Sequence, residues 1–191
     1  MPFTNHPLFD TADCSAGQTD HVWFLGGVLG GGHPANRYCT IPAGTALFLA
    51  VTNSEWDNTN CNGAVIEPTN FTIEQLRSSA EQSVDDLLLG GRGYATIDGV
   101  QVQGVSGLDP VYRVESPVFG YSIPSQDNLL VKIDGSCYDN AQPADRTVEE
   151  AVADGVYLMI KPLSVGPHTI VFGRDFGGGV RHTYHITVTG Q

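Results

Sequence analysis

Basic side chains are scarce in this sequence. It has 9 Lys and Arg against 21 Asp and Glu in 191 residues, which gives a formal net charge of −12. A surface of this charge repels phosphate groups, so it argues against nucleic acid and anionic membrane as partners. It favours cations or neutral polymers, although a well-solvated surface explains the same charge.

Long apolar runs are missing as well. No run reaches the roughly 18 residues that a membrane-spanning helix needs. No secretory signal stands at the start, and we interpret Met1–Phe3 as the beginning of a trimmed chain. Hydrophobic residues make up 41% of the sequence, enough for a sizeable core, so we expect one domain over residues 1–191.

The few cysteines never form the C-x-x-C pairs that are typical of zinc sites. There are 4 of them, at Cys14, Cys39, Cys61 and Cys137. An even number at wide spacing favours disulfides, each worth on the order of 2–4 kcal/mol. Of the possible pairings we prefer Cys14–Cys39 with Cys61–Cys137, since the first closes a loop around one strand. Disulfides in turn indicate a secreted or extracytoplasmic protein.

What the sequence does contain is a series of short β-strands between turn signals. The 23 glycines and 11 prolines fit many tight turns. Val156–Lys161 is apolar on both faces, which is typical of a strand in the middle of a covered sheet. His168–Gly173 and His182–Thr189 follow as a closing hairpin, and the latter alternates between apolar and polar residues. Helices do not alternate with strands, which argues against a parallel α/β fold.

Further strands are expected along the chain. Ala46–Thr52 is apolar on both faces and is predicted to be a second central strand, joined to Tyr38–Ile41 by a hairpin turn at Pro42–Gly44. Asp98-Gly99 is a strong hairpin signal. The remaining candidates are His21–Leu29, Ala95–Ile97, Val100–Gln103, Val111–Glu115, Val118–Ile123 and Leu129–Ile133.

One amphipathic helix is predicted over about residues 72–89. Thr72 is its expected N-cap with Gln75 as the capping-box partner, and Gly90-Gly91 ends it. Its apolar stripe needs a partner, and the doubly apolar strands need a second cover. We therefore predict an all-β protein: an antiparallel β-sandwich, jelly-roll or immunoglobulin-like, with this helix covering one sheet.

Two stretches carry a resemblance. The first runs from Gln18 through Val-Trp-Phe-Leu-Gly-Gly to Arg37-Tyr38-Cys39-Thr40-Ile41-Pro42-Ala43-Gly44-Thr45-Ala46-Leu47-Phe48. The second runs from Ala153-Asp154-Gly155-Val156-Tyr157 through Lys161-Pro162-Leu163 to Gly166-Pro167-His168-Thr169-Ile170. Together with Tyr112–Pro117 they resemble a group of secreted microbial proteins of unassigned activity. The resemblance implies secretion and no particular chemistry.

A shorter likeness concerns architecture. Asp154-Gly155-Val156-Tyr157 resembles the Asp-Gly-x-Tyr corner of immunoglobulin-like sandwiches. The Cys…Trp…Cys spacing of true immunoglobulin domains is absent from the sequence.

Our first candidate site is the polar segment that follows the predicted central strand, Asn53–Gly63. Asn53, Glu55, Trp56 and Asp57 would offer an apolar plate beside hydrogen-bond acceptors, as a sugar ring requires. Glu55 and Asp57 would also serve as catalytic acid and base if burial separated their pKa values. In an extended segment, however, the two carboxylates share a face and Trp56 points away. A solvated turn with Trp56 packed on the core is the alternative.

Arg113 and Glu115 form a second candidate site, since they share one face of a predicted strand. They would either line a cleft or take part in cross-strand ion pairing. No motif predicts a bound metal or cofactor: His182 and His185 point to opposite faces, and Asn58–Gly63 lacks the carboxylates of a calcium loop. Asn70 begins a possible N-glycan acceptor sequence.

Three functions are compatible with these features. The first is an extracellular ligand-binding protein for carbohydrate, whose partner is a small molecule or polysaccharide. The second is a carbohydrate-active hydrolase or lyase that uses Glu55 and Asp57. The third is a structural or adhesive surface protein.

Overall fold

The computed structural model describes most of the chain. The described residues are 6–9, 13–18, 21–28, 34–62, 65–107, 109–125, 145–175 and 180–190, with the backbone alone for 60–62 and 65–67. The elements are β1 (Val22–Leu25), β2 (Asn36–Pro42), β3 (Ala46–Asp57), β4 (Thr59–Asn62), β5 (Val65–Pro68), α1 (Ile73–Gly90), β6 (Arg92–Ile97), β7 (Val100–Gln101), β8 (Arg113–Glu115), β9 (Phe119–Ile123), β10 (Arg146–Ile160), β11 (Gly166–Asp175) and β12 (Arg181–Thr189).

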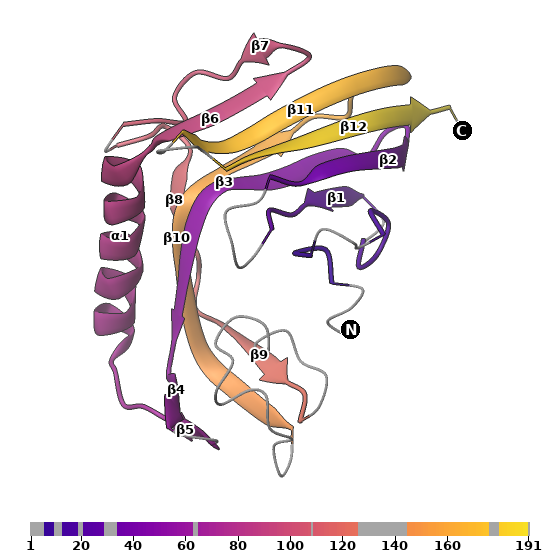
Figure 1. Ribbon diagram of the computed structural model, residues 1–191. Coiled ribbons are helices and arrows are strands. Elements are labelled where there is room, and N and C mark those ends of the chain that lie inside the picture. Colours follow the sequence, from indigo (N-terminus) through magenta and orange to yellow (C-terminus); the bar gives the residue numbers. More distant parts are fainter. Residues whose placement is uncertain are drawn as a thin grey trace.

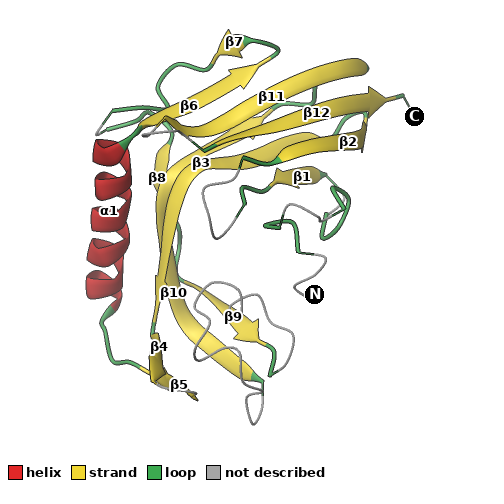
Figure 2. Ribbon diagram, viewed as in Figure 1, coloured by secondary structure: helices red, strands yellow, loops and turns green. Residues whose placement is uncertain are grey.

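In the described part of the chain, two mixed sheets and one helix make up the body, and β4 and β5 form a separate two-stranded sheet (Figures 1 and 2). Sheet A has the order β1-β3-β10-β8, with β9 also paired to β10, and sheet B has the order β2-β12-β11-β6-β7. The predicted β-sandwich with one covering helix is confirmed. Most pairs are antiparallel as expected, but β1 pairs parallel with β3 and β2 pairs parallel with β12.

The packing of the core explains why the sequences of β3 and β10 have the pattern of central strands. Leu49 of β3 and Leu158 of β10 are buried against Ile170 and Phe172 of sheet B. Further along, the same face of sheet A continues beneath helix α1, which contributes Val84 to this cluster. One face of the two long strands is therefore covered by sheet B at one end and by the helix at the other (Figure 1).

A β-bulge in β3 keeps that face continuous. Thr52 pairs with Val156, but the next β10 residue, Tyr157, pairs with Ala50, so Val51 is an extra residue. Val51 and Thr52 are both buried, which two successive residues of a regular strand would not be on a single covered face. The bulge shifts the alternation of β3 by one residue.

The helix begins and ends close to the predicted residues. The Gln75 amide donates to the Thr72 hydroxyl at 3.2 Å, and the Thr72 amide donates to the Gln75 side chain at 2.9 Å, completing the capping box. Residues at four-residue spacing form the buried stripe: Leu76, Ala80, Val84 and Leu88. The predicted N-cap and covering role of this helix are confirmed.

Two predictions about the chain near residue 50 are wrong. The turn at Pro42–Gly44 is not a hairpin, because β2 lies in sheet B and β3 in sheet A. Both strands bury their alternate residues between the sheets, so the turn is an arch over the core. The predicted strand Ala46–Thr52 also ends too early: Asn53–Asp57 extends β3, since β10 pairs with it as far as Asp57.

The disulfide prediction is confirmed for one pair. Cys14 and Cys39 are bonded, with their Cα atoms 5.6 Å apart, and this bond ties the N-terminal segment to β2. The Cys61–Cys137 pair and the strand at Leu129–Ile133 lie outside the described residues or side chains. No helix in the described part of the chain is long and apolar enough to span a bilayer.

The Asp98-Gly99 hairpin joins β6 and β7 as expected. Asp98 and Gly99 both have positive φ, 51° and 79°, as a two-residue turn of this type requires.

Candidate functional site

The side chains of Asn53–Asp57, the polar half of β3, lie alternately on the two faces of sheet A. Ser54 pairs with Asp154, and Trp56 pairs with Val152, on the side that faces the helix. Asn53, Glu55 and Asp57 alternate with them and therefore lie on the opposite side. The prediction that the two carboxylates share a face in an extended segment is confirmed.

Asp57 is held by three donors. The Thr59 amide and hydroxyl donate to Oδ1 at 2.7 and 2.6 Å, and the Tyr121 hydroxyl donates to Oδ2. Tyr121 comes from β9, on the far side of β10. Its side chain therefore spans β10, where Ala151 is fully buried and pairs with Asp57 on one side and with Phe119 on the other.

The pKa of the Glu55 carboxyl group is higher than is usual for a glutamate. Partial burial, and second the charge of Asp57, raise the pKa of Glu55 to about 7. The side chain keeps contact with solvent. Two carboxyl groups two residues apart thus differ in their surroundings: Glu55 has its charged form disfavoured, while Asp57 receives hydrogen bonds at both oxygens.

The floor between these side chains is made of small residues of β10. Ala151, Ala153 and Gly155 pair with Asp57, Glu55 and Asn53 respectively. At Gly155 any side chain would collide, because a Cβ atom would stand 2.6 Å from the Asn53 Cβ and 2.8 Å from the Tyr157 Cζ.

Aromatic rings border this floor. Phe119 and Tyr121 of β9 have ring centroids 6.5 Å apart. At the other end Phe48 and Tyr157 stack at 5.7 Å. We call the surface formed by Asn53, Glu55, Asp57, Phe119 and Tyr121 the carboxylate face.

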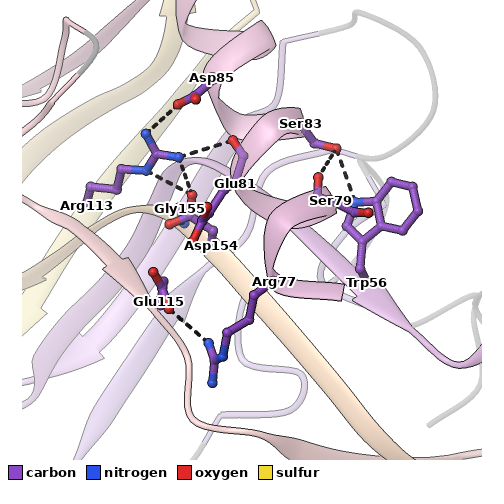
Figure 3. A network of polar contacts seen from close by, with 10 residues as sticks. All are labelled: Trp56, Arg77, Ser79, Glu81, Ser83, Asp85, Arg113, Glu115, Asp154 and Gly155. Atoms are coloured by element: carbon purple, nitrogen blue, oxygen red, sulfur yellow. Dashed lines mark hydrogen bonds and ion pairs between the residues drawn. The ribbon is translucent and has the colours of Figure 1, made fainter. Parts of the chain in front are cut away.

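Trp56 is separated from the carboxylate face. Its indole Nε1–H donates to the Ser83 hydroxyl of helix α1 at 3.1 Å, and Ser83 donates in turn to the Ser79 carbonyl (Figure 3). The ring remains 39% exposed at the margin of the helix. The structure thus brings together three of the four residues of the first candidate site and turns the fourth to the helix.

The second candidate site, Arg113 with Glu115, also faces the helix. Arg113 pairs with Asp154 of β10 and with Asp85 of the helix, both at 2.6 Å, whereas Glu115 pairs with Arg77 at 3.1 Å (Figure 3). Of the two predicted roles, ion pairing across strands is the one that the structure contains. These residues lie on the opposite side of sheet A from the carboxylate face.

Asp154 is the centre of that network. Its side chain is only 2% exposed, and Oδ2 accepts from both Nε and Nη2 of Arg113, at 2.8 and 2.6 Å. Oδ1 accepts from the Gly155 amide at 2.9 Å. The Asp-Gly-x-Tyr sequence that resembles an immunoglobulin corner thus anchors the helix to the sheet through its aspartate.

The two histidines of β12 lie on opposite faces of sheet B. His182 is buried on the core face of β12, while His185 stacks on Tyr38 at 4.6 Å on the other face. Within the described ranges, no three His, Cys, Asp or Glu side chains gather as ligands for an ion.

Tyr121 and Phe119 are the site residues that sequence reasoning missed. Their signal was present, because alternate residues of the predicted strand Val118–Ile123 are aromatic and so share a face. What was missing was the neighbour of that strand, which is β10.

Searches of protein-family models, curated proteins and solved structures find no match for this chain. Its function is therefore argued from its own residues.

Proposed function

We propose that this protein is a secreted, extracellular carbohydrate-binding protein whose ligand lies on the carboxylate face. The observation that carries the proposal is the combination on one sheet face of paired carboxylates, an amide and aromatic rings beside a floor of small residues. The Cys14–Cys39 disulfide supports an oxidising, extracytoplasmic compartment.

The chemistry of the face suits a neutral sugar. Sugar hydroxyl groups donate to carboxylate and amide oxygens, here those of Asn53, Glu55 and Asp57. Aromatic rings such as Phe119 pack against the apolar faces of pyranose rings, and the partly exposed Ala153 of β10 adds little bulk beside Glu55. A net charge of −12 disfavours sulfated and uronic-acid polymers, so neutral glycans fit best.

Calorimetry with a panel of neutral oligosaccharides tests this proposal. We expect D57N and Y121F to weaken binding about tenfold each, because about 1.4 kcal/mol is a reasonable cost for a lost hydrogen bond to a charged group. D86N, on an exposed position of the helix, is the matched control and should bind like wild type. Wild-type protein that binds no neutral glycan, or D57N that binds normally, would refute the proposal.

A second function, a carbohydrate-active hydrolase, is favoured by one specific observation. The raised pKa of Glu55 leaves part of its population protonated near neutral pH, beside the carboxylate of Asp57. Glu55 would donate the proton to the leaving oxygen, and Asp57 would act as base or nucleophile.

The two functions are separated by one variant. E55Q keeps the size and hydrogen bonding of Glu55 but removes the transferable proton. If the protein is a hydrolase, E55Q should lose about a hundredfold or more of its turnover on the polysaccharide that it binds, with binding retained. If wild type shows no turnover on any glycan that it binds, the hydrolase function is excluded.

A further inference from the structure

A separate cavity of about 530 Å³ opens where the N-terminal segment, β3 and sheet B meet. Its size is typical of small-molecule sites. Most of its wall is apolar, with side chains from four parts of the chain. The principal apolar side chains are Leu25, Phe48, Val51, Leu87 and Val180. Its charged or titratable lining side chains are Arg174, His182 and Tyr157.

Arg174 makes few hydrogen bonds for a half-buried arginine. Its Nη1 donates a hydrogen bond to the Leu87 carbonyl at a long 3.3 Å. Burial lowers its pKa, with no opposing effect from a carboxylate. Its neighbour Asp175 is paired with Arg181 instead, at 2.6 Å.

Arg174 also differs from the other arginines whose contacts the structure describes. Arg37 is buried as well, but it donates to the Tyr184 hydroxyl and to the Gly26 and Phe9 carbonyls. Arg77, Arg113 and Arg181 each have a carboxylate partner at 3.1 Å or less. Arg174 lines a largely apolar cavity, and among the described residues it has no carboxylate partner at such a distance. A desolvated guanidinium with one weak partner gains much from a planar anion, which it can bind through two parallel hydrogen bonds.

His182 stands in the same wall. Its Nδ1 accepts a hydrogen bond from the Ala35 amide at 3.2 Å, so the neutral ring carries its proton on Nε2. A Cβ atom at Gly27 would stand 3.1 Å from that Nε2, so a side chain there would press on the imidazole. Gly27 therefore helps to keep this part of the wall open.

We propose that this cavity, the Arg174 cavity, binds a small monocarboxylic acid with an apolar body, such as a medium-chain fatty acid. The carboxylate pairs with Arg174, and the chain lies against Leu25, Phe48 and Val51. One cation suits one negative charge, whereas a phosphate dianion would leave charge unmatched among apolar walls. The site adjoins the carboxylate face, since Phe48, Asn53 and Tyr157 border both, but it does not include Glu55 or Asp57.

Calorimetry with octanoate tests this assignment, with octan-1-ol as the uncharged probe. Wild type should bind octanoate at least tenfold more tightly than octanol. R174M should lose at least tenfold in octanoate affinity, and R92M, at an exposed arginine, should lose none. D57N should bind octanoate normally, which separates this proposal from the carbohydrate proposal. Equal binding of octanol and octanoate, or normal octanoate binding by R174M, overturns it.

Wild-type protein provides a second measurement if R174M does not fold. Amide chemical-shift changes on adding octanoate should centre on Gly26, Gly27 and Gly173, which line the cavity. Absence of saturable changes, or changes centred elsewhere, overturns the proposal as well.

Discussion

Removing Arg113 should destabilise the protein more than removing any exposed charge. Arg113→Ala leaves the Asp154 carboxylate, 2% exposed, without both hydrogen bonds that Nε and Nη2 donate to it. Breaking a buried pair by deleting one partner typically costs about 3–5 kcal/mol. Because the Arg113 side chain is itself 19% exposed, water can reach part of the vacated space, and we expect about 3 kcal/mol.

Equilibrium urea unfolding measures this loss, and Asp85→Asn is the matched control. Asp85 also pairs with Arg113 at 2.6 Å, but its side chain is 42% exposed, so its removal should cost about 1 kcal/mol or less. The double variant R113A/D154A should cost less than the sum of the single variants, because no unpaired charge stays buried. A loss below about 1 kcal/mol for R113A, or equal losses for R113A and D85N, would refute the reasoning.

Three further predictions concern other parts of the fold. Because the pKa of Glu55 is raised in the folded state, the folded protein binds the extra proton, so this residue's contribution to stability falls as pH rises from about 4.5 to about 7. E55Q should show a flatter dependence of the urea midpoint over that range, and an unchanged slope would contradict this. Thr72→Ala should cost about 1 kcal/mol through loss of the helix cap, measured by thermal unfolding. Gly155→Ala should cost about 1–3 kcal/mol, since its methyl group would meet β3 atoms at 2.6 Å, whereas Gly190→Ala, in open space, should be neutral.

Local signals in the sequence were sufficient for the helix and the tight turn. The Thr72 and Gln75 capping box and the Asp98-Gly99 turn depend on residues within a few positions of one another. They need no knowledge of the distant chain, and the structure agrees with both.

Long-range pairing decided what the sequence could not. Asn53–Asp57 has the composition of a loop, yet it is a strand because Ala151–Gly155 of β10 lies beside it. Composition likewise could not show that the turn at Pro42–Gly44 changes sheets, since a turn of this kind serves a hairpin or an arch equally well.

For the same reason, the sequence could predict which face each residue of the candidate site occupies but not which residues it contacts. Alternation along an extended chain is sufficient to place Glu55 and Asp57 on one face and Trp56 on the other. The partners of these residues, Tyr121 for Asp57 and Ser83 for Trp56, come from elements 27 or more positions away. No local pattern could identify them.

The bulge at Val51 determines which face each of these side chains occupies. Before it, Leu47 and Leu49 point into the core; if the same residues ran as a regular strand through Val51, the alternation would send positions 53, 55 and 57 toward the helix. Both carboxylates would then face the buried Ala80 and Val152, where a charge is costly, and Trp56 would stand on the open side. With the bulge, the indole reaches Ser83 and the carboxylates reach solvent and Tyr121. A single inserted residue thus separates the surface that holds the helix from the surface that carries the proposed site.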